Sequence, residues 1–316
     1  MTTRERLGEL IGLSHAKTLA VRLGTGVSES HAVLFYGPEG SGKSELAAIL
    51  AQAWLCNSPS SDGACGVCAS CQSSGRGTHP DLLVIEPLPP SHIIRLAAVT
   101  GGDETLSIQQ LFRTPPLSGR NKVAIVSSAE RMNADAANAF LKTLEEPPTH
   151  AKLILTSASP GSMLATILSR CMACACELPT RDELAATFPE ADDFTLQLAG
   201  GAPGRVRRLL AAPSTGEALR NLALDISALV PRDALAISER VRSVAEARDA
   251  ASGVGARRAQ ADTLAELGIA LRVVGCHEAL APVAEAHRRI LGNGSATLVF
   301  DQLFTRLACA QRVGNS

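Results

Sequence analysis

Aromatic side chains are scarce in this chain, at 3% of residues, with a single Trp54 and a single Tyr36. Proteins that stack bases along a strand need several exposed aromatic rings, so this scarcity argues against a base-stacking platform. An excess of one charge sign is also missing, because 30 basic and 31 acidic residues leave a formal net charge of −1. That balance argues against a protein that coats nucleic acid, although not against a local basic face.

Long apolar runs are absent as well. No stretch approaches the roughly 20 apolar residues of a membrane span, and Met1 to Arg6 lack the apolar segment of a signal peptide. We therefore expect a cytoplasmic protein without a membrane partner. Nine cysteines in that compartment indicate free thiols or a metal site, not a disulfide framework.

The most informative stretch begins with a short apolar run of strand type, Val33 to Tyr36. The spacing G-x-x-x-x-G-K-[ST] follows, and then a helical pattern from Glu45 to Trp54. In such a loop the backbone N–H groups point at phosphate oxygens, the lysine reaches the β- and γ-phosphates, and the serine hydroxyl binds Mg²⁺. The sequence predicts a nucleotide-binding loop for ATP and Mg²⁺, and leaves open whether the nucleotide is bound or used. The loop residues are Gly37, Pro38, Gly40, Gly42, Lys43 and Ser44.

A polar insert at about residues 56–79 carries the pattern C-x8-C-x2-C-x2-C. Four thiolates complete a tetrahedral Zn²⁺ site and leave no position for a substrate, so the zinc would be structural. The insert has little apolar area with which to order itself, and a metal would supply that stabilisation. Two alternatives stay open: an iron–sulfur cluster on the same thiolates, and four unrelated free cysteines. The expected ligands are Cys56, Cys65, Cys68 and Cys71.

Strand and helix patterns alternate up to residue 178, which predicts an α/β fold with a parallel sheet covered on both faces. Residues 4–27 carry helical periodicity, residues 87–104 look like an irregular loop, and a short helix is expected over 103–113. From Thr180 onward only helical patterns remain, with a linker at 211–216. Helix breaks are expected near Pro231, Gly253, Gly275 and the run Gly292-Asn293-Gly294.

Several features occur in a fixed order: the phosphate loop, the four-cysteine insert, His79-Pro80-Asp81, the run Asn138 to Pro148, and Ser169-Arg170-Cys171. Over roughly residues 1–212 they resemble the bacterial DNA polymerase III clamp-loader subunits of the AAA+ class. The resemblance implies an AAA+ nucleotide-binding core at 1–178 that contains the zinc module. It also implies a small helical lid at 179–212 and an all-α collar domain for oligomerisation at 213–316.

Within that family the chain is more similar to the delta-prime type than to the gamma/tau motor type. By register with the motors, Ser127 and Ser128 stand where a motor has an Asp and a Glu at the end of its third strand. A hydroxyl neither carries the negative charge that organises Mg²⁺ nor accepts a proton at neutral pH, so we expect no ATP hydrolysis by the chain alone. Glu130, two residues further on, is not expected to replace the missing base.

The resemblance gives Arg170 the role of an arginine finger that acts in trans on the nucleotide of a neighbouring subunit. The alternative is a surface arginine paired with Glu177 or another nearby carboxylate. Arg205, which follows Gly-Ala-Pro-Gly, would contact phosphate in cis or remain a solvated helix residue.

The implied function is help in loading the sliding clamp onto primed DNA during replication, as part of the DNA polymerase III holoenzyme. The implied partners are the motor subunits gamma/tau, the delta subunit and, through the complex, the sliding clamp and primer-template DNA. Two other functions remain: an active gamma/tau-like ATPase, and a zinc-dependent nucleic-acid-binding protein. An acidic pair at 127–128 would have favoured the first, and the balanced charge and scarce aromatics argue against the second.

Overall fold

The computed structural model describes residues 1–87, 91–102, 106–292 and 294–314. The chain divides into two compact units, one of residues 1–187 with 202–204 and one of residues 188–201 with 205–316. A sheet flanked by helices forms the first unit, and helices form the second.

The strands of the first unit form one parallel sheet with the order β2-β3-β4-β1-β5. The central strands are mostly apolar and almost entirely buried because helices cover both faces of the sheet. β1 lies between β4 and β5, so Tyr36 at its carboxyl end is beside Ser157 and Ala175. This confirms the predicted parallel α/β sheet. The strands are β1 (Ala32–Tyr36), β2 (Leu82–Ile85), β3 (Lys122–Val126), β4 (Ala151–Ser157) and β5 (Met172–Ala175).

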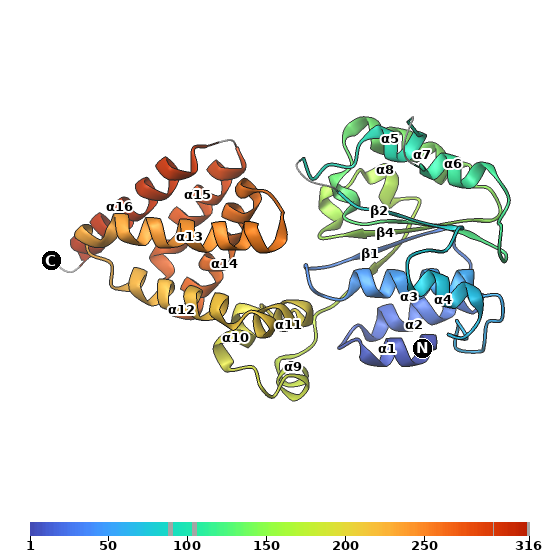
Figure 1. Ribbon diagram of the computed structural model, residues 1–316, viewed down its shortest axis with the longest axis horizontal. Helices are drawn as coiled ribbons and strands as arrows, with labels where there is room; N and C mark the ends of the chain where they lie inside the picture. The colour runs from blue at the N-terminus through green and yellow to red at the C-terminus, as the bar shows by residue number, and fades with distance from the viewer. Residues whose placement is uncertain (88–90, 103–105, 293, 315–316) are drawn as a thin grey trace. The chain divides into compact units, whose positions relative to one another are not determined.

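Helices pack on each face of this sheet (Figure 1). Successive residues of β1 alternate between the two layers: Phe35 joins the core on one face and Leu34 the core on the other. The first face carries α1 (Thr3–Glu9), α2 (Ser14–Gly24), α3 (Lys43–Leu55) and α4 (Ala69–Gly75). The second face carries α5 (Leu96–Thr100), α6 (Ile108–Arg113), α7 (Ala134–Glu145) and α8 (Ala165–Leu168). Short 3₁₀ turns follow β3 and β4, at η1 (Ala129–Arg131) and η2 (Pro160–Ser162), and α9 (Arg181–Thr187) ends the first unit.

The second unit has its own apolar core, in which Phe300 and Phe304 are fully buried. The division between the units runs through the first turn of α11 (Pro203–Ala211). None of the helices in the described part of the chain is long and apolar enough to cross a membrane. The other helices of this unit are α10 (Asp193–Leu198), α12 (Pro213–Ser227), η3 (Pro231–Asp233), α13 (Ala234–Ser252), α14 (Ala256–Val273), η4 (His277–Ala279), α15 (Leu280–Leu291) and α16 (Ala296–Gly314).

Some local predictions need correction. The expected loop at 87–104 contains helix α5, and the helix expected over 103–113 begins only at Ile108, where Ser107 and Gln110 form a capping box. Residues 88–90 and 103–105 of these two segments lie outside the described residues. The linker expected at 211–216 is wrong, because α12 starts at Pro213, a residue well suited to the first turn of a helix.

The single periodic segment expected over 4–27 forms two helices, α1 and α2. The chain turns between them at Leu13, which has a left-handed backbone with φ 61°. Helix ends expected near Pro231, Gly253 and Gly275 are found in the second unit. Asn293, in the last expected break, lies outside the described residues.

Candidate functional site

The phosphate loop joins the end of β1 to the start of α3. Gly40 and Gly42 have φ values of 82° and 98°, a left-handed backbone that glycine adopts without strain. Gly37 donates its N–H to the carbonyl of Ser157 at 3.0 Å, which fixes the start of the loop against the end of β4. The loop is therefore held at the carboxyl edge of the sheet, where open parallel sheets bind ligands.

Lys43 is the first residue of α3 and is largely buried. Its Nζ donates to the carbonyl of Pro38, within the loop, at 3.1 Å. Burial lowers the pKa of Lys43, and the negative charges of Glu39 and Glu130 partly oppose that effect. In the described part of the chain this ammonium forms no ion pair. An anion bound over the loop would supply the missing countercharge, and the exposed Ser44 follows at the next position.

Helix α11 begins beside the phosphate loop. Gly204 donates its N–H to the carbonyl of Gly40 at 2.9 Å, and a Cβ on Gly204 would lie 3.1 Å from the Cα of Gly40. Both glycines belong to the first unit. Arg205, the next residue, belongs to the second unit, where it lines a cavity of about 630 Å³ together with Arg208 and Arg248. A phosphate contact by Arg205 stays a prediction.

The end of β3 presents hydroxyls instead of carboxylates. Ser127 Oγ donates to Glu86 Oε1 at 3.5 Å, and Ser128, with φ 52°, donates its N–H to Thr156 Oγ1 at 3.1 Å. Glu130, in the 3₁₀ turn that follows, accepts from Ala158 N at 3.3 Å, while its Oε2 is buried without a hydrogen-bond partner among the described residues. Acidic side chains thus lie near this edge, but not at the two positions that a motor uses.

The four cysteines of the insert lie together. Their Sγ atoms all fall within 4.8 Å of one another, and the closest pairs are 3.6 to 3.9 Å apart. A tetrahedral zinc with Zn–S bonds of about 2.3 Å requires S···S edges of about 3.8 Å. The cluster therefore fits such an ion, with Cys56 arriving from the end of α3 and Cys68 and Cys71 from the start of α4.

Backbone N–H groups point at these sulfurs. Cys65 N donates to Cys56 Sγ, Cys68 N to Cys65 Sγ and Cys71 N to Cys68 Sγ, each at 3.4 Å. Burial raises the pKa of Cys68, but hydrogen bonds from Cys71 and Asn57 to its sulfur outweigh this and hold the pKa at about 6. For Cys71 burial dominates and raises the pKa. A cation would stabilise the thiolate form at all four positions.

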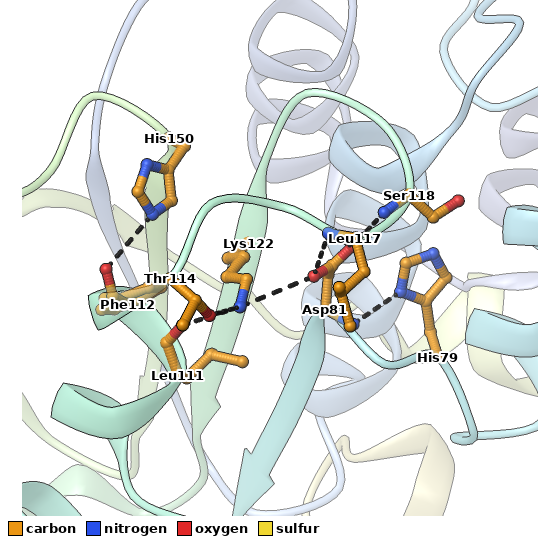
Figure 2. A network of polar contacts seen from close by, with 9 residues as sticks. All are labelled: His79, Asp81, Leu111, Phe112, Thr114, Leu117, Ser118, Lys122 and His150. Carbon is orange, nitrogen blue, oxygen red and sulfur yellow. Dashed lines mark hydrogen bonds and ion pairs between the residues drawn. The ribbon is translucent and has the colours of Figure 1, made fainter.

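A buried polar network lies at the opposite edge of the sheet (Figure 2). Asp81 is fully buried, and its carboxylate accepts from the N–H groups of Leu117 and Ser118 at 2.7 to 3.0 Å. Lys122 Nζ lies 3.8 Å from the same carboxylate. His79 Nδ1 accepts from Asp81 N at 3.0 Å, and burial lowers the pKa of His79. The triplet His79-Pro80-Asp81 is therefore part of the architecture and lies away from the phosphate loop.

Arg170 lies between α8 and β5, and its guanidinium contacts its own chain. Nη2 is 2.7 Å from Glu145 Oε1, at the end of α7, and Nη1 donates to the carbonyl of Thr166 at 2.9 Å. Both side chains of the ion pair are partly exposed, 35% for Arg170 and 48% for Glu145. Pairing with a nearby carboxylate was the alternative considered from the sequence, although the partner is Glu145 instead of Glu177. Burial raises the pKa of the neighbouring Cys171 thiol to about 12.

Comparison with known proteins identifies the family. Residues 17–179 match the family described as "DNA polymerase III, delta subunit". The chain belongs to this family. It is 41% identical over 196 residues to the DNA polymerase III subunit delta' of Pseudomonas aeruginosa, an alignment that covers 60% of this chain and 58% of the relative. It is 36% identical over 142 residues to the delta' subunit of Bacillus subtilis, covering 45% of this chain and 40% of that protein.

The tau subunits match over less of their own length. The DNA polymerase III subunit tau of Escherichia coli is 33% identical over 169 residues, which is 53% of this chain and 25% of tau. Among solved structures, a DNA polymerase III gamma subunit-related protein of Thermotoga maritima aligns with 93% of this chain and 98% of its own, at 20% identity and a TM-score of 0.51. That likeness supports the fold alone. The chain spans little more than half of the first curated relative that it matches.

Two groups of residues were missed by the sequence analysis. Glu145 belongs to the noted run Asn138 to Pro148, but nothing in the sequence pairs it with Arg170, which lies 25 positions further along. Asp81 belongs to the noted triplet, but no motif marks its partners, Lys122 at the start of β3 and Ser118 in the preceding loop. Only the sheet brings these positions together.

Proposed function

We propose that this chain acts as a delta-prime-like subunit of a DNA polymerase III clamp loader, which places the sliding clamp on primed DNA during replication. Membership of the family, with a delta' relative 41% identical over 60% of the chain, is the observation that carries this proposal. The proposed partners are the gamma/tau motor subunits, the delta subunit, the clamp and primer-template DNA.

The subunit would bind nucleotide without hydrolysing it. In favour of binding, the loop glycines have the required backbone and Lys43 has no carboxylate partner in ion-pair range in the described chain. Against hydrolysis, Ser127 and Ser128 offer hydroxyls where charge and a base are needed. Losing a general base alone commonly costs on the order of 100- to 10,000-fold in rate.

Its contribution to catalysis would be made on a neighbour, through Arg170. A guanidinium stays charged at neutral pH and offers a planar fork of donors to phosphate oxygens. The contact with Glu145 does not oppose this role. Exposed ion pairs of this kind are worth roughly 0–1 kcal/mol, so a triphosphate with several negative charges would compete for the arginine at little cost.

The remaining parts would be structural. Zinc on the four cysteines would order the insert, residues 179–212 would form the lid and residues 213–316 the collar that holds the ring together. Arg205, which follows Gly-Ala-Pro-Gly, would contact phosphate in cis. Each of these assignments follows the resemblance to the family and the composition of the segments.

The central experiment is reconstitution of the loader with Arg170→Ala. We expect assembly to persist and the DNA- and clamp-stimulated ATPase to fall only partly, because one motor site alone faces this subunit. Arg170→Lys should rescue poorly, since a point charge does not reproduce the fork. Arg113→Ala, an exposed arginine in the last turn of α6, is the matched control. An Arg170→Ala loader that loads clamps at the wild-type rate would refute the finger.

Nucleotide binding is tested on the isolated chain by calorimetric titration with an ATP analogue. Lys43→Ala should weaken binding at least about tenfold, or about 1.4 kcal/mol. Equal affinity of the two proteins would remove the phosphate loop from the proposal and leave the finger untouched.

A further inference from the structure

The side chain of Ser118, in the loop before β3, contacts two separate parts of the cysteine-bearing insert. Ser118 Oγ lies 3.1 Å from Ser70 Oγ and accepts from Asn57 Nδ2 at 3.4 Å. Ser70 is in α4 between Cys68 and Cys71, and Asn57 directly follows Cys56. The Ser118 hydroxyl therefore links the residue that follows Cys56 to the helix that carries Cys71.

The backbone of Ser118 is held by the buried carboxylate of Asp81 (Figure 2). Asp81 Oδ2 accepts from Ser118 N at 2.7 Å, and both carboxylate oxygens accept from Leu117 N. Lys122, 5% exposed, lies 3.8 Å from that carboxylate and also donates to Thr114 Oγ1 and the carbonyl of Leu111. Hydrogen bonds to an ionised acceptor are stronger than neutral ones. The backbone that carries the Ser118 hydroxyl is therefore held firmly, although Ser118 itself is only half-buried.

The residues after Ser118 continue the same contact. Gly119 has φ 99°, and a Cβ there would lie 2.8 Å from Asn57 Oδ1. Asn121 Nδ2 donates to the carbonyl of Trp54 at 2.9 Å, in the last turn of α3 before Cys56. This loop lies against the segment that leads into the cluster, and the left-handed backbone at Gly119 favours glycine there.

We infer that Ser118 is a positioning residue for the four-cysteine site. Held by Asp81, it fixes the Cys56 end of the insert relative to the Cys68–Cys71 end, so that a metal ion meets thiols already arranged around it. Without this link the insert must order itself when the ion binds, and binding weakens. Side chains that hydrogen-bond the metal ligands typically change metal affinity or activity by roughly 10- to 100-fold, and Ser118 acts one residue further from the ligands. The inference rests on the proposed zinc site.

The test measures the affinity of the purified full chain for Zn²⁺ by competition with a chromogenic chelator, and for Co²⁺ by its thiolate absorption bands. Ser118→Ala and Ser70→Ala should each weaken Zn²⁺ binding about tenfold, and the double variant no further than Ser118→Ala, because that change already removes the contact with Ser70. Ser118→Thr keeps the hydroxyl and should retain most of the affinity. Ser73→Ala is the control, since Ser73 lies in the same helix and its hydroxyl donates to helix carbonyls, those of Ala69 and Ser70.

A second readout separates positioning from packing. The melting temperature of Ser118→Ala is compared with that of the wild type, once with metal and once after chelation. Positioning predicts a larger loss in the metal-loaded protein than in the metal-free one. Equal losses with unchanged Zn²⁺ affinity, or wild-type affinity of Ser118→Ala and Ser70→Ala, would overturn the inference. Wild-type protein that holds less than about a tenth of an equivalent of Zn²⁺ would instead refute the zinc site, since structural sites bind tightly.

Discussion

The amino ends of strands β2 and β3 carry a buried carboxylate, whereas the carboxyl end of β3 carries hydroxyls. At the amino ends, Asp81 directly precedes β2 and faces Lys122, the first residue of β3. Each of its oxygens has hydrogen-bond donors, and neither side chain is more than 5% exposed. At the carboxyl end of β3, where a motor needs two acids, the chain has Ser127 and Ser128.

Within one pair of strands, the buried charges at the amino ends serve the structure, and the carboxyl ends face the candidate nucleotide site. Burying an ion pair costs desolvation, which its attraction and hydrogen bonds offset, so such a pair is kept when it fixes a structure. The carboxyl edge has the phosphate loop, and under the proposed function it lacks the acidic pair that hydrolysis needs. This is the arrangement we expect of a subunit that holds nucleotide and leaves hydrolysis to its neighbours.

Removing the buried acid should have the largest effect. Asp81→Ala leaves the Lys122 ammonium buried without its countercharge and two backbone N–H groups without their acceptor. Breaking a buried pair from one side typically costs about 3–5 kcal/mol of unfolding free energy. Fluorescence of Trp54, the single tryptophan, reports on this unit during urea unfolding.

Asp62→Ala is the matched control for that experiment, because Asp62 makes only an exposed ion pair with Arg4 at 3.8 Å. Its loss should stay below about 1 kcal/mol. Replacing both partners, Asp81→Leu with Lys122→Met, should recover part of the stability, since no charge is then left unpaired. If Asp81→Ala lowers the unfolding free energy no more than the control does, the buried pair of Asp81 and Lys122 does not stabilise the amino ends of the strands.

The opposite edge is tested by ATP turnover. We expect the isolated chain to turn over at least about 100-fold more slowly than the roughly 1–100 s⁻¹ of kinases. Ser127→Asp with Ser128→Glu should raise the rate, although only in part, because the left-handed backbone of Ser128 strains a larger side chain.

The isosteric pair Ser127→Asn with Ser128→Gln supplies the same bulk without charge and should not raise turnover. Wild-type turnover in the range of kinases would show that another residue acts as the base. Glu130 would then be the first to examine, since one of its oxygens is buried without a partner among the described residues.

The sequence sufficed for those parts of the molecule that depend on local spacing. The phosphate loop and the four cysteines were located by pattern, because a glycine turn and a thiolate cluster each need particular residues at fixed intervals. The parallel sheet followed from alternating strand and helix signals, and the order of its strands did not. Helix α5 was missed because its five residues are too few to show a helical period.

Contacts between distant positions could not be predicted in the same way. Ser118 and Ser70 are 48 positions apart; Ser70 is an unspecified position of the four-cysteine pattern, and Ser118 belongs to no motif. Their meeting depends on where the sheet sets the loop before β3, which is fixed by long-range packing. Arg170 and Glu145 illustrate the same limit, since both lie in motifs that were noted separately.

The smallest effect is expected at Glu145, and it separates the two roles of its partner. Glu145 is the last residue of α7, where a negative charge opposes the helix dipole, and Arg170 offsets that charge. Glu145→Gln removes both the ion pair and the unfavourable charge, so the unfolding free energy should change by less than about 1 kcal/mol. Glu146→Gln, at the next position, removes a similar charge without touching the pair and serves as the control. In the reconstituted loader Glu145→Gln should leave the stimulated ATPase close to that of the wild type, whereas Arg170→Ala should lower it partly, because in Glu145→Gln the finger itself remains. An ATPase loss as large as that of Arg170→Ala, or a stability loss above about 2 kcal/mol, would mean that the pair with Glu145 is the working state of Arg170 and that the arginine does not leave it for a neighbour's phosphate.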